Sequence, residues 1–354
     1  MVCPMDWGLG HATRLVPIIE SLLEKKARVI LAADNKPLEF LRQRFPQCPW
    51  VQLPGYEPFY QKKGFLALKV TSDLPKMFLE SRKAHDLFEK LIDQWDVYAV
   101  ISDNRYELWS DKVPTVFMTH QLRIMTQGVL APTQAAIQKV LYSFIEKHDE
   151  VWIPDFSEEP NLSSGLSHVK KLPRLPVFYI GPLSRFQKID TRRLSTKENF
   201  DLLCIMSGPE PQRSMLEELL INQALKTPYK TLILSAKPGE AKKQRKNNVE
   251  IWPHASDEEM FALIQSAKYV ISRSGYTTVM DLATLGKKAI FIPTPQQPEQ
   301  EYLAAEYLAK GLYFSQPQSK FQLEYALKQS ENYTGLQVRN NYSLLNRRID
   351  HLLK

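Results

Sequence analysis

Runs of strand-forming residues alternate with amphipathic helical patterns over nearly the whole chain, and this alternation restricts the fold more than any other feature. Strands separated by helices form parallel sheets that carry helices on both faces. The predicted class is therefore α/β, with two Rossmann-like halves. The expected strands are Arg28–Ala33, Val97–Ser102, Thr115–Thr119, Glu150–Ile153 and Val177–Ile180, then Asp201–Ser207, Thr231–Ala236, Val249–Trp252, Tyr269–Ser272 and Ala289–Pro293. The expected helices are Asp73–Gln94, Thr133–Lys147, Gln212–Lys226, Asp257–Ser266, Thr277–Leu285 and Glu299–Lys310.

The length of 354 residues exceeds one ordinary core and suits two domains. Gly181–Asn199 has little periodicity and several basic residues, so we place the linker there. The predicted domains are residues 1–182 and 183–336, with their sheets facing across one cleft. Residues 337–354 form a last helix that we expect to pack back on the first domain. Its apolar stripe consists of Val338, Tyr342, Leu345, Ile349 and Leu352.

Composition restricts the environment and the partners. No apolar run approaches the roughly 20 residues that span a bilayer, and MVCPMDWG is too short and polar for a secretory signal. We therefore expect a cytoplasmic protein. Its three cysteines (Cys3, Cys48, Cys204) lack metal or disulfide spacing. The net charge of +7 fits either a polyanionic partner or a generally basic surface.

The opening stretch GLGHATR places two glycines and a histidine before a well-patterned helix. Gly8, Gly10 and His11 lie in the turn between a short apolar start and that helix. In α/β folds such turns point backbone N–H groups and a helix dipole at an anion. Glycines that serve only a tight connection would look the same. The helix stripe consists of Leu15, Ile18, Ile19, Leu22 and Leu23.

Three loops of the second half combine residues that suit a nucleotide diphosphate: Ser207–Pro211, Arg273–Thr278 and Pro293–Gln300. In the middle loop Gly275 permits close backbone approach to an anion, and hydroxyls with first-turn amides bind its oxygens. Plain N-caps would also be Ser or Thr. The anion-binding candidates of this loop are Ser274, Gly275, Tyr276 and Thr277.

Two further groups lie next to these loops. Asp281, one helical turn beyond Thr277, is placed to accept both hydroxyls of a ribose, although an acidic residue there also complements the helix dipole. The loop IPTPQQPEQEYLAAE offers amides and carboxylates, which suit a sugar. On a plain surface loop the same side chains would serve only solubility.

The segment SRSGYTTVMDLATLGKKAIFIPTPQQPEQEYLA is similar to the donor-site region of MurG-type N-acetylglucosaminyltransferases in glycosyltransferase family 28. These enzymes have the two-domain GT-B fold. The resemblance extends over nearly the whole chain in element order. It is specific at the opening turn, at YIGPLSR, at the SRSG helix start and at the glutamine-rich loop.

The resemblance implies a role for several residues. Asp281 stands where the family carries an acidic ribose ligand, and Gln300 stands where a glutamine reads donor-sugar hydroxyls, with Glu299 or Glu301 beside it. Arg185, after the hinge glycine, matches a basic residue that meets the diphosphate.

The turn at Ser207 and Gly208 aligns with a glycine-rich loop of the family. MSGPEPQR lacks the extra glycines, so its contribution stays open.

GLGHATR also resembles the G-x-G-H-x-x-R segment of PseG-type UDP-sugar hydrolases, which pass the sugar to water. There the histidine serves as general base. A helix N-terminus disfavours imidazolium, so His11 would be neutral and able to take a proton from a hydroxyl or from water. It would equally suit a contact to phosphate. Asp103 and His120 follow neighbouring strands and are the alternative bases.

Two basic stretches lead to different interpretations. In residues 62–69 the apolar Phe65, Leu66 and Leu68 lie between Lys62 and Lys63 on one side and Lys69 on the other, which suits an anionic membrane surface or a solvated loop. KPGEAKKQRKNN is predicted to be a solvated loop. Nothing in the sequence supports a nucleic-acid partner.

We therefore expect an inverting, metal-independent glycosyltransferase that takes its sugar, an N-acetylhexosamine, from UDP and requires no cofactor. The resemblance implies a lipid-linked or cell-envelope acceptor and a cytoplasmic protein at the membrane surface. The alternatives are a UDP-sugar hydrolase and a nucleotide-sugar-binding protein without turnover.

Overall fold

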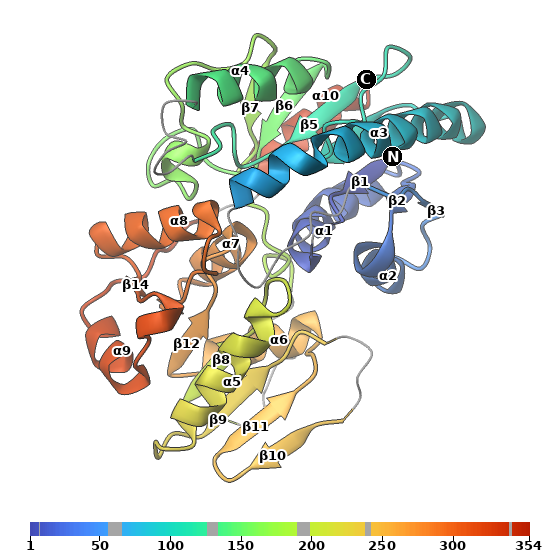
Figure 1. Ribbon diagram of the computed structural model, residues 1–354. Coiled ribbons are helices and arrows are strands. Elements are labelled where there is room, and N and C mark those ends of the chain that lie inside the picture. Colours follow the sequence, from blue (N-terminus) through green and yellow to red (C-terminus); the bar gives the residue numbers. More distant parts are fainter. Residues whose placement is uncertain (7, 56–65, 126–133, 190–198, 238–241, 340–341) are drawn as a thin grey trace. The chain divides into compact units, whose positions relative to one another are not determined.

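The computed structural model describes residues 1–354 except 7, 56–65, 126–133, 190–198, 238–241 and 340–341, and it leaves the side chains of residues 66–78 undescribed. The described chain divides into two compact units (Figure 1). Unit 1 comprises Met1–Ser184 and Asn340–Lys354, and unit 2 comprises Arg185–Arg339.

Unit 1 is built on a seven-stranded sheet in the order β3-β2-β1-β4-β5-β6-β7, in which every neighbouring pair is parallel. Its strands are β1 (Val2–Pro4), β2 (Leu31–Ala33), β3 (Trp50–Gln52), β4 (Val100–Asp103), β5 (Thr115–Met118), β6 (Glu150–Ile153) and β7 (Val177–Tyr179). Its helices are α1 (Leu9–Glu24), α2 (Asn35–Arg44), α3 (Leu66–Trp95), α4 (Gln134–Ile145) and α10 (Ser343–Leu352), with a 3₁₀ turn at Ser164–Leu166.

Helix α1 returns the chain from β1 to β2 and carries the residues that open the site. Its apolar face, Leu15, Ile18, Ile19 and Leu22, is buried, as the stripe in the sequence predicts. On another side α10 packs against α1, where Ser21 Oγ donates to Asn346 Oδ1 over 2.5 Å. The C-terminal segment is thereby part of unit 1.

Unit 2 contains a second seven-stranded sheet in the order β10-β11-β9-β8-β12-β13-β14. All of its pairs are parallel except the antiparallel pair of β10 with β11. Its strands are β8 (Leu202–Ile205), β9 (Thr231–Leu234), β10 (Gln244–Lys246), β11 (Val249–Trp252), β12 (Tyr269–Ser272), β13 (Ile290–Phe291) and β14 (Phe314–Ser315). Its helices are α5 (Gln212–Ala224), α6 (Asp257–Ser266), α7 (Tyr276–Leu285), α8 (Pro298–Ala309) and α9 (Leu323–Ser330), with a 3₁₀ turn at Gln318–Lys320.

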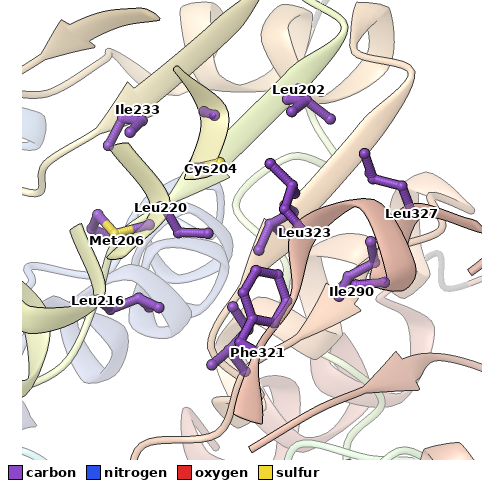
Figure 2. Packing of buried hydrophobic residues seen from close by; sticks show 14 of the residues in the cluster. Leu202, Cys204, Met206, Leu216, Leu220, Ile233, Ile290, Phe321, Leu323 and Leu327 are labelled. Carbon is purple, nitrogen blue, oxygen red and sulfur yellow. The ribbon is translucent and has the colours of Figure 1, made fainter. Parts of the chain in front are cut away.

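The core of unit 2 joins the sheet to α5 and α9. Figure 2 shows Leu220 of α5 near Cys204 and Leu216 of the same helix near Met206, with Phe321, Leu323 and Leu327 beside Ile290. Burial of a full aliphatic side chain contributes about 1.5–3 kcal/mol, so this cluster holds the strands whose ends carry the candidate donor site.

The predicted α/β class with two parallel-dominated sheets is confirmed. One loop prediction is wrong in part, because Gln244–Lys246, inside KPGEAKKQRKNN, forms the edge strand β10. Its side chains are all exposed, and charged residues on an edge strand discourage pairing with another chain. The sequence pattern missed β10 because an edge strand exposed on both faces has no apolar alternation.

Candidate active site

The candidate site of unit 1 begins where β1 passes into α1. Gly8 is the N-cap residue of α1 with a φ of 74°, a left-handed conformation that favours glycine. A Cβ built on Gly8 meets no atom within 4 Å, so backbone strain alone disfavours a larger residue there. Gly10 and His11 lie in the first turn of α1, and no side chain caps that helix end.

A histidine and an aspartate meet in this part of unit 1. Asp103 is the last residue of β4, beside Pro4 of β1, and it is fully buried. His11 Nδ1 lies 3.0 Å from Asp103 Oδ2, and 14% of the histidine side chain is exposed. A carboxylate on Nδ1 orients an imidazole and leaves Nε2 as the atom that exchanges a proton. We call this pair the His11–Asp103 dyad.

Arg14 organises the dyad, a role that was not predicted from the sequence. It lies one turn after His11 on α1 and is only 1% exposed. Arg14 Nε donates to Asp103 Oδ2 over 2.7 Å, and Nη2 contacts Oδ1 of the same carboxylate. The signal was present, because Arg14 is the arginine of the G-x-G-H-x-x-R segment.

The third candidate base also lies in this cluster. His120 follows β5, the neighbour of β4, and is 4% exposed. Arg14 Nη1 lies 2.8 Å from His120 Nδ1, and Arg14 Nη2 lies 2.9 Å from His11 Nδ1. The structure thus brings all three predicted catalytic residues together around one guanidinium.

The electrostatics of the cluster keep the carboxylate ionised and the histidine neutral. Burial alone would raise the pKa of Asp103, but Arg14 and His11 outweigh it and lower that pKa to about 2. Burial and the charge of Arg14 lower the pKa of His11 below its ordinary value of 6.5, against the opposing effect of Asp103. A neutral His11 beside an ionised Asp103 is the state that a general base requires near pH 7.

A second candidate site lies in unit 2, at the turn between β12 and α7. Gly275 is the N-cap residue of α7, and no side chain caps this helix end. Ser274 is buried, and its Oγ donates to the backbone oxygen of Gln300 over 2.8 Å. Tyr276 is buried and Thr277 is half-buried in the first turn of α7. The first-turn amides of α7 therefore remain the elements of this turn that suit an anion.

Arg273 precedes this turn and holds two neighbouring loops. Its Nη1 donates to the backbone oxygens of Ile292 and Pro293 over 3.0 and 3.1 Å, and its Nη2 donates to that of Gln212 over 2.9 Å. Burial lowers its pKa to about 10. Arg273 thereby connects the end of β12 to the end of β13 and the start of α5. We call these connected ends, with the loops that follow β12 and β13, the platform.

Gln300 connects the glutamine-rich loop to the same platform. Its Oε1 accepts a hydrogen bond from the backbone N–H of Thr294 over 2.9 Å, so the amide oxygen stabilises the loop. Its Nε2 lies 3.9 Å from the position of a Cβ on Gly275, which puts the amide N–H groups beside the α7 start. Glu299 is a half-buried residue in the first turn of α8, and Glu301 accepts from the backbone of Gln296.

Ser207 and Gly208 follow β8 on the same side of the platform. Gly208 is exposed with a φ of 97°, and a Cβ there would lie 3.5 Å from Thr294 Oγ1. Thr294 is the residue whose backbone Gln300 holds. The structure therefore brings the three predicted second-half loops together.

Arg185 and Asp281 are paired with each other. Arg185 Nε lies 3.5 Å from Asp281 Oδ2, and Arg185 Nη1 donates to Asp257 Oδ1 over 2.9 Å. Asp281 is 6% exposed and Arg185 retains 18% of its side-chain surface. Asp257 was not identifiable from the sequence, because an acidic residue in the first turn of a helix is common on any protein.

Other predictions concern membrane contact and metal binding. Residues 62–65 of the proposed membrane-contacting stretch 62–69 lie outside the described residues, as do the side chains of 66–69. Among the described residues, no cluster of three or more His, Cys, Asp or Glu side chains could hold a metal ion. Within the same residues, no helix is both long and apolar enough to cross a membrane.

Known proteins resemble this chain both in sequence and in fold. Residues 214–332, within unit 2, match the family described as the glycosyltransferase family 28 C-terminal domain. Solved structures similar over the whole chain include the glycotransferase of kitacinnamycin (TM-score 0.64, 13% identity, 100% of this chain and 98% of that one) and MurG of Acinetobacter baumannii (TM-score 0.54, 14% identity, 99% of each chain). The chain has the GT-B fold.

Two curated relatives extend the comparison. An uncharacterized glycosyltransferase of Methanopyrus kandleri is 21% identical over 339 residues, 86% of each chain. The UDP-N-acetylglucosamine–N-acetylmuramyl-(pentapeptide) pyrophosphoryl-undecaprenol N-acetylglucosamine transferase of Glaesserella parasuis is 43% identical over 53 residues, 15% of each chain. The predicted resemblance to GT-B glycosyltransferases with a family 28 C-terminal domain is confirmed.

Proposed function

We propose that this GT-B glycosyltransferase moves an N-acetylhexosamine from a UDP-sugar to a hydroxyl acceptor with inversion at the anomeric carbon. The observation that carries the proposal is the hydrogen bond between His11 Nδ1 and the buried, ionised Asp103. This dyad, which opens at the N-terminal turn of α1, has the residue types and geometry of a general base with an orienting carboxylate.

The proposed reaction is a single displacement. His11 Nε2 removes the proton of the acceptor hydroxyl as its oxygen attacks the anomeric carbon. The bond between that carbon and the phosphate oxygen breaks, and UDP leaves with the bonding electrons. The imidazolium that forms carries a proton on each ring nitrogen, and Asp103 stabilises it by accepting from Nδ1.

The proposed donor site is the platform of unit 2. The uncapped start of α7 at Gly275 binds the diphosphate through backbone N–H groups, which stabilises the leaving group without a metal ion or other cofactor. Asp281 accepts from the ribose hydroxyls, and Gln300 donates to the sugar. The choice of UDP and an N-acetylhexosamine rests on the names of the Glaesserella parasuis relative and on the local 43% identity to it.

The proposed acceptor is a lipid-linked or cell-envelope glycan, taken from a membrane surface on the cytoplasmic side. This part rests on the same relative, whose name specifies a pyrophosphoryl-undecaprenol acceptor. The basic and apolar residues of 62–69 and the net charge of +7 suit an anionic surface.

The test is an acceptor screen with several UDP-sugars. Mass spectrometry measures the glycosylated acceptors, and a coupled assay measures UDP release. We expect acceptor-dependent UDP release that survives EDTA, with the product in the inverted configuration. Rapid UDP release without any acceptor would instead show a hydrolase, and UDP binding without sugar loss would show a protein without turnover. Activity lost with EDTA and restored by manganese would contradict the metal-independent mechanism.

Calorimetry with UDP and UDP-N-acetylglucosamine tests whether Asp281 binds the nucleotide and Gln300 binds the sugar. Asp281→Ala should weaken binding of UDP itself, because a hydrogen bond to a charged group contributes about 1.5–3 kcal/mol. Gln300→Ala should leave UDP affinity nearly intact and reduce discrimination among UDP-sugars. Equal loss of UDP affinity in both variants would contradict this assignment of roles.

The structure supplies matched controls for this experiment. Asp257→Asn removes the other carboxylate of Arg185, so any effect that passes through Arg185 appears in it as well. Gln300→Glu retains an oxygen that accepts from Thr294 N–H but removes the amide donor. If discrimination is lost in Gln300→Ala but kept in Gln300→Glu, Gln300 acts only by holding its loop.

A further inference from the structure

One guanidinium group contacts both histidines of the unit 1 cluster. Arg14 Nη1 lies 2.8 Å from His120 Nδ1, and Arg14 Nη2 lies 2.9 Å from His11 Nδ1. The Arg14 and His120 side chains are 1% and 4% exposed, so Arg14 makes both contacts from a buried position. His120 is one of the alternative bases that the sequence suggests, and its contact with Arg14 decides whether it can accept a proton.

The chemistry of arginine decides the state of His120. A guanidinium carries five N–H donors, has no acceptor, and stays protonated in proteins. The nitrogen that faces Arg14, His120 Nδ1, must therefore accept the hydrogen bond. A neutral imidazole that accepts at Nδ1 has its hydrogen on Nε2, whereas a protonated imidazole has no acceptor at all.

We infer that Arg14 holds His120 in the neutral form with its hydrogen on Nε2, so that His120 is a hydrogen-bond donor and not the base. The inference rests on the proposed function in one respect, because it leaves proton abstraction to His11. Arg14 is then a positioning residue that acts through both rings. No further substrate contact of Arg14 is needed for this role.

The environment of His11 differs at the corresponding atom. His11 Nδ1 lies 2.9 Å from Arg14 Nη2 but also 3.0 Å from Asp103 Oδ2, an ionised acceptor. This nitrogen can therefore either accept from Arg14 or donate to Asp103, and the proposed role of His11 as base requires that it donates. A hydrogen on Nδ1 satisfies Asp103 and leaves the lone pair of Nε2 available for the proton of a hydroxyl. The two histidines should therefore carry their hydrogens on opposite nitrogens.

Nitrogen NMR tests the inference on the wild-type chain. The chain is labelled with ¹⁵N-histidine, and a long-range ¹H–¹⁵N correlation spectrum near pH 7 distinguishes the protonated from the unprotonated nitrogen of each of its seven rings. His120→Gln and His11→Gln assign the two signals by their loss. We expect His120 protonated on Nε2 alone and His11 on Nδ1 alone.

The possible spectra separate the two proposals. A hydrogen on Nδ1 of His120, or on both of its nitrogens, overturns the inference about Arg14. A hydrogen on Nε2 of His11 contradicts its role as base and hence the proposed mechanism, while the state of His120 remains as inferred. Neither reading depends on knowing the acceptor.

Activity provides a second, independent readout. Glutamine carries an acceptor oxygen and an NH₂ donor group on a planar amide, so His120→Gln can reproduce both functions of the inferred form. Its turnover should stay within about tenfold of wild type and above that of His120→Ala, whereas His11→Gln should lose about 10²–10⁴-fold. If a folded His120→Gln that still binds UDP is as inactive as His11→Gln, the inference is wrong.

Discussion

Replacing His11 by alanine should lower the rate of the chemical step by about 10²–10⁴-fold, the range that general-base catalysis contributes. UDP affinity should stay within a few-fold, because the proposed donor site lies in unit 2 and His11 belongs to unit 1. Single-turnover kinetics with saturating UDP-sugar and acceptor separates the chemical step from binding.

Asp103→Asn is the matched variant for the His11 experiment. An amide at this position retains the shape of the side chain but no longer favours a hydrogen on His11 Nδ1, so turnover should also fall strongly. Full turnover in His11→Ala with weaker UDP binding alone would make the histidine a phosphate contact. The search for the base would then return to Asp103.

Removing Arg14 should destabilise the folded protein by about 3–5 kcal/mol, the loss expected when one partner of a buried ion pair is deleted. Arg14→Leu leaves the carboxylate of Asp103 fully buried without the guanidinium that helps to outweigh the cost of burying its charge. Urea denaturation followed by circular dichroism measures the free energy of unfolding. Because the chain has two units, the transition that includes unit 1 is the one to compare.

Two controls accompany the Arg14 experiment. Arg14→Leu combined with Asp103→Asn removes the buried charge and should recover part of the loss. The pKa of Asp103 falls from 3.8 to about 2 on folding, so its contribution to stability is complete above about pH 4 and disappears as the pH falls toward 2. If Arg14→Leu is as stable as wild type, Arg14 does not hold the cluster together.

The sequence alone predicted the alternating α/β order, because strands that are buried on both faces carry continuous apolar runs. It did not predict β3, a three-residue strand with two exposed residues, or β14, which has two residues. Such short strands contain too few residues for an alternation of apolar and polar positions to be recognised. They form because a neighbouring strand supplies the hydrogen-bond partners.

The candidate site was predictable at the level of single residues but not of their connections. His11, Asp103 and His120 were identifiable from their places after strands and at a helix start. Arg14 contacts Asp103 and His120, which lie about 90 and 106 positions further along the chain. No local sequence pattern encodes contacts over such distances. The pairing of Arg185 with Asp257 is likewise a long-range contact, 72 positions apart.

The pH dependence of turnover tests the central claim, that His11 is the base of a glycosyl transfer, most directly. Burial and Arg14 lower the pKa of His11, so wild-type kcat/KM for the acceptor should be constant near pH 7 and should fall only below 6.5. The falling limb should be absent from the residual activity of His11→Ala. An unchanged limb in His11→Ala would contradict the account, because another group would then be the one that must lose its proton.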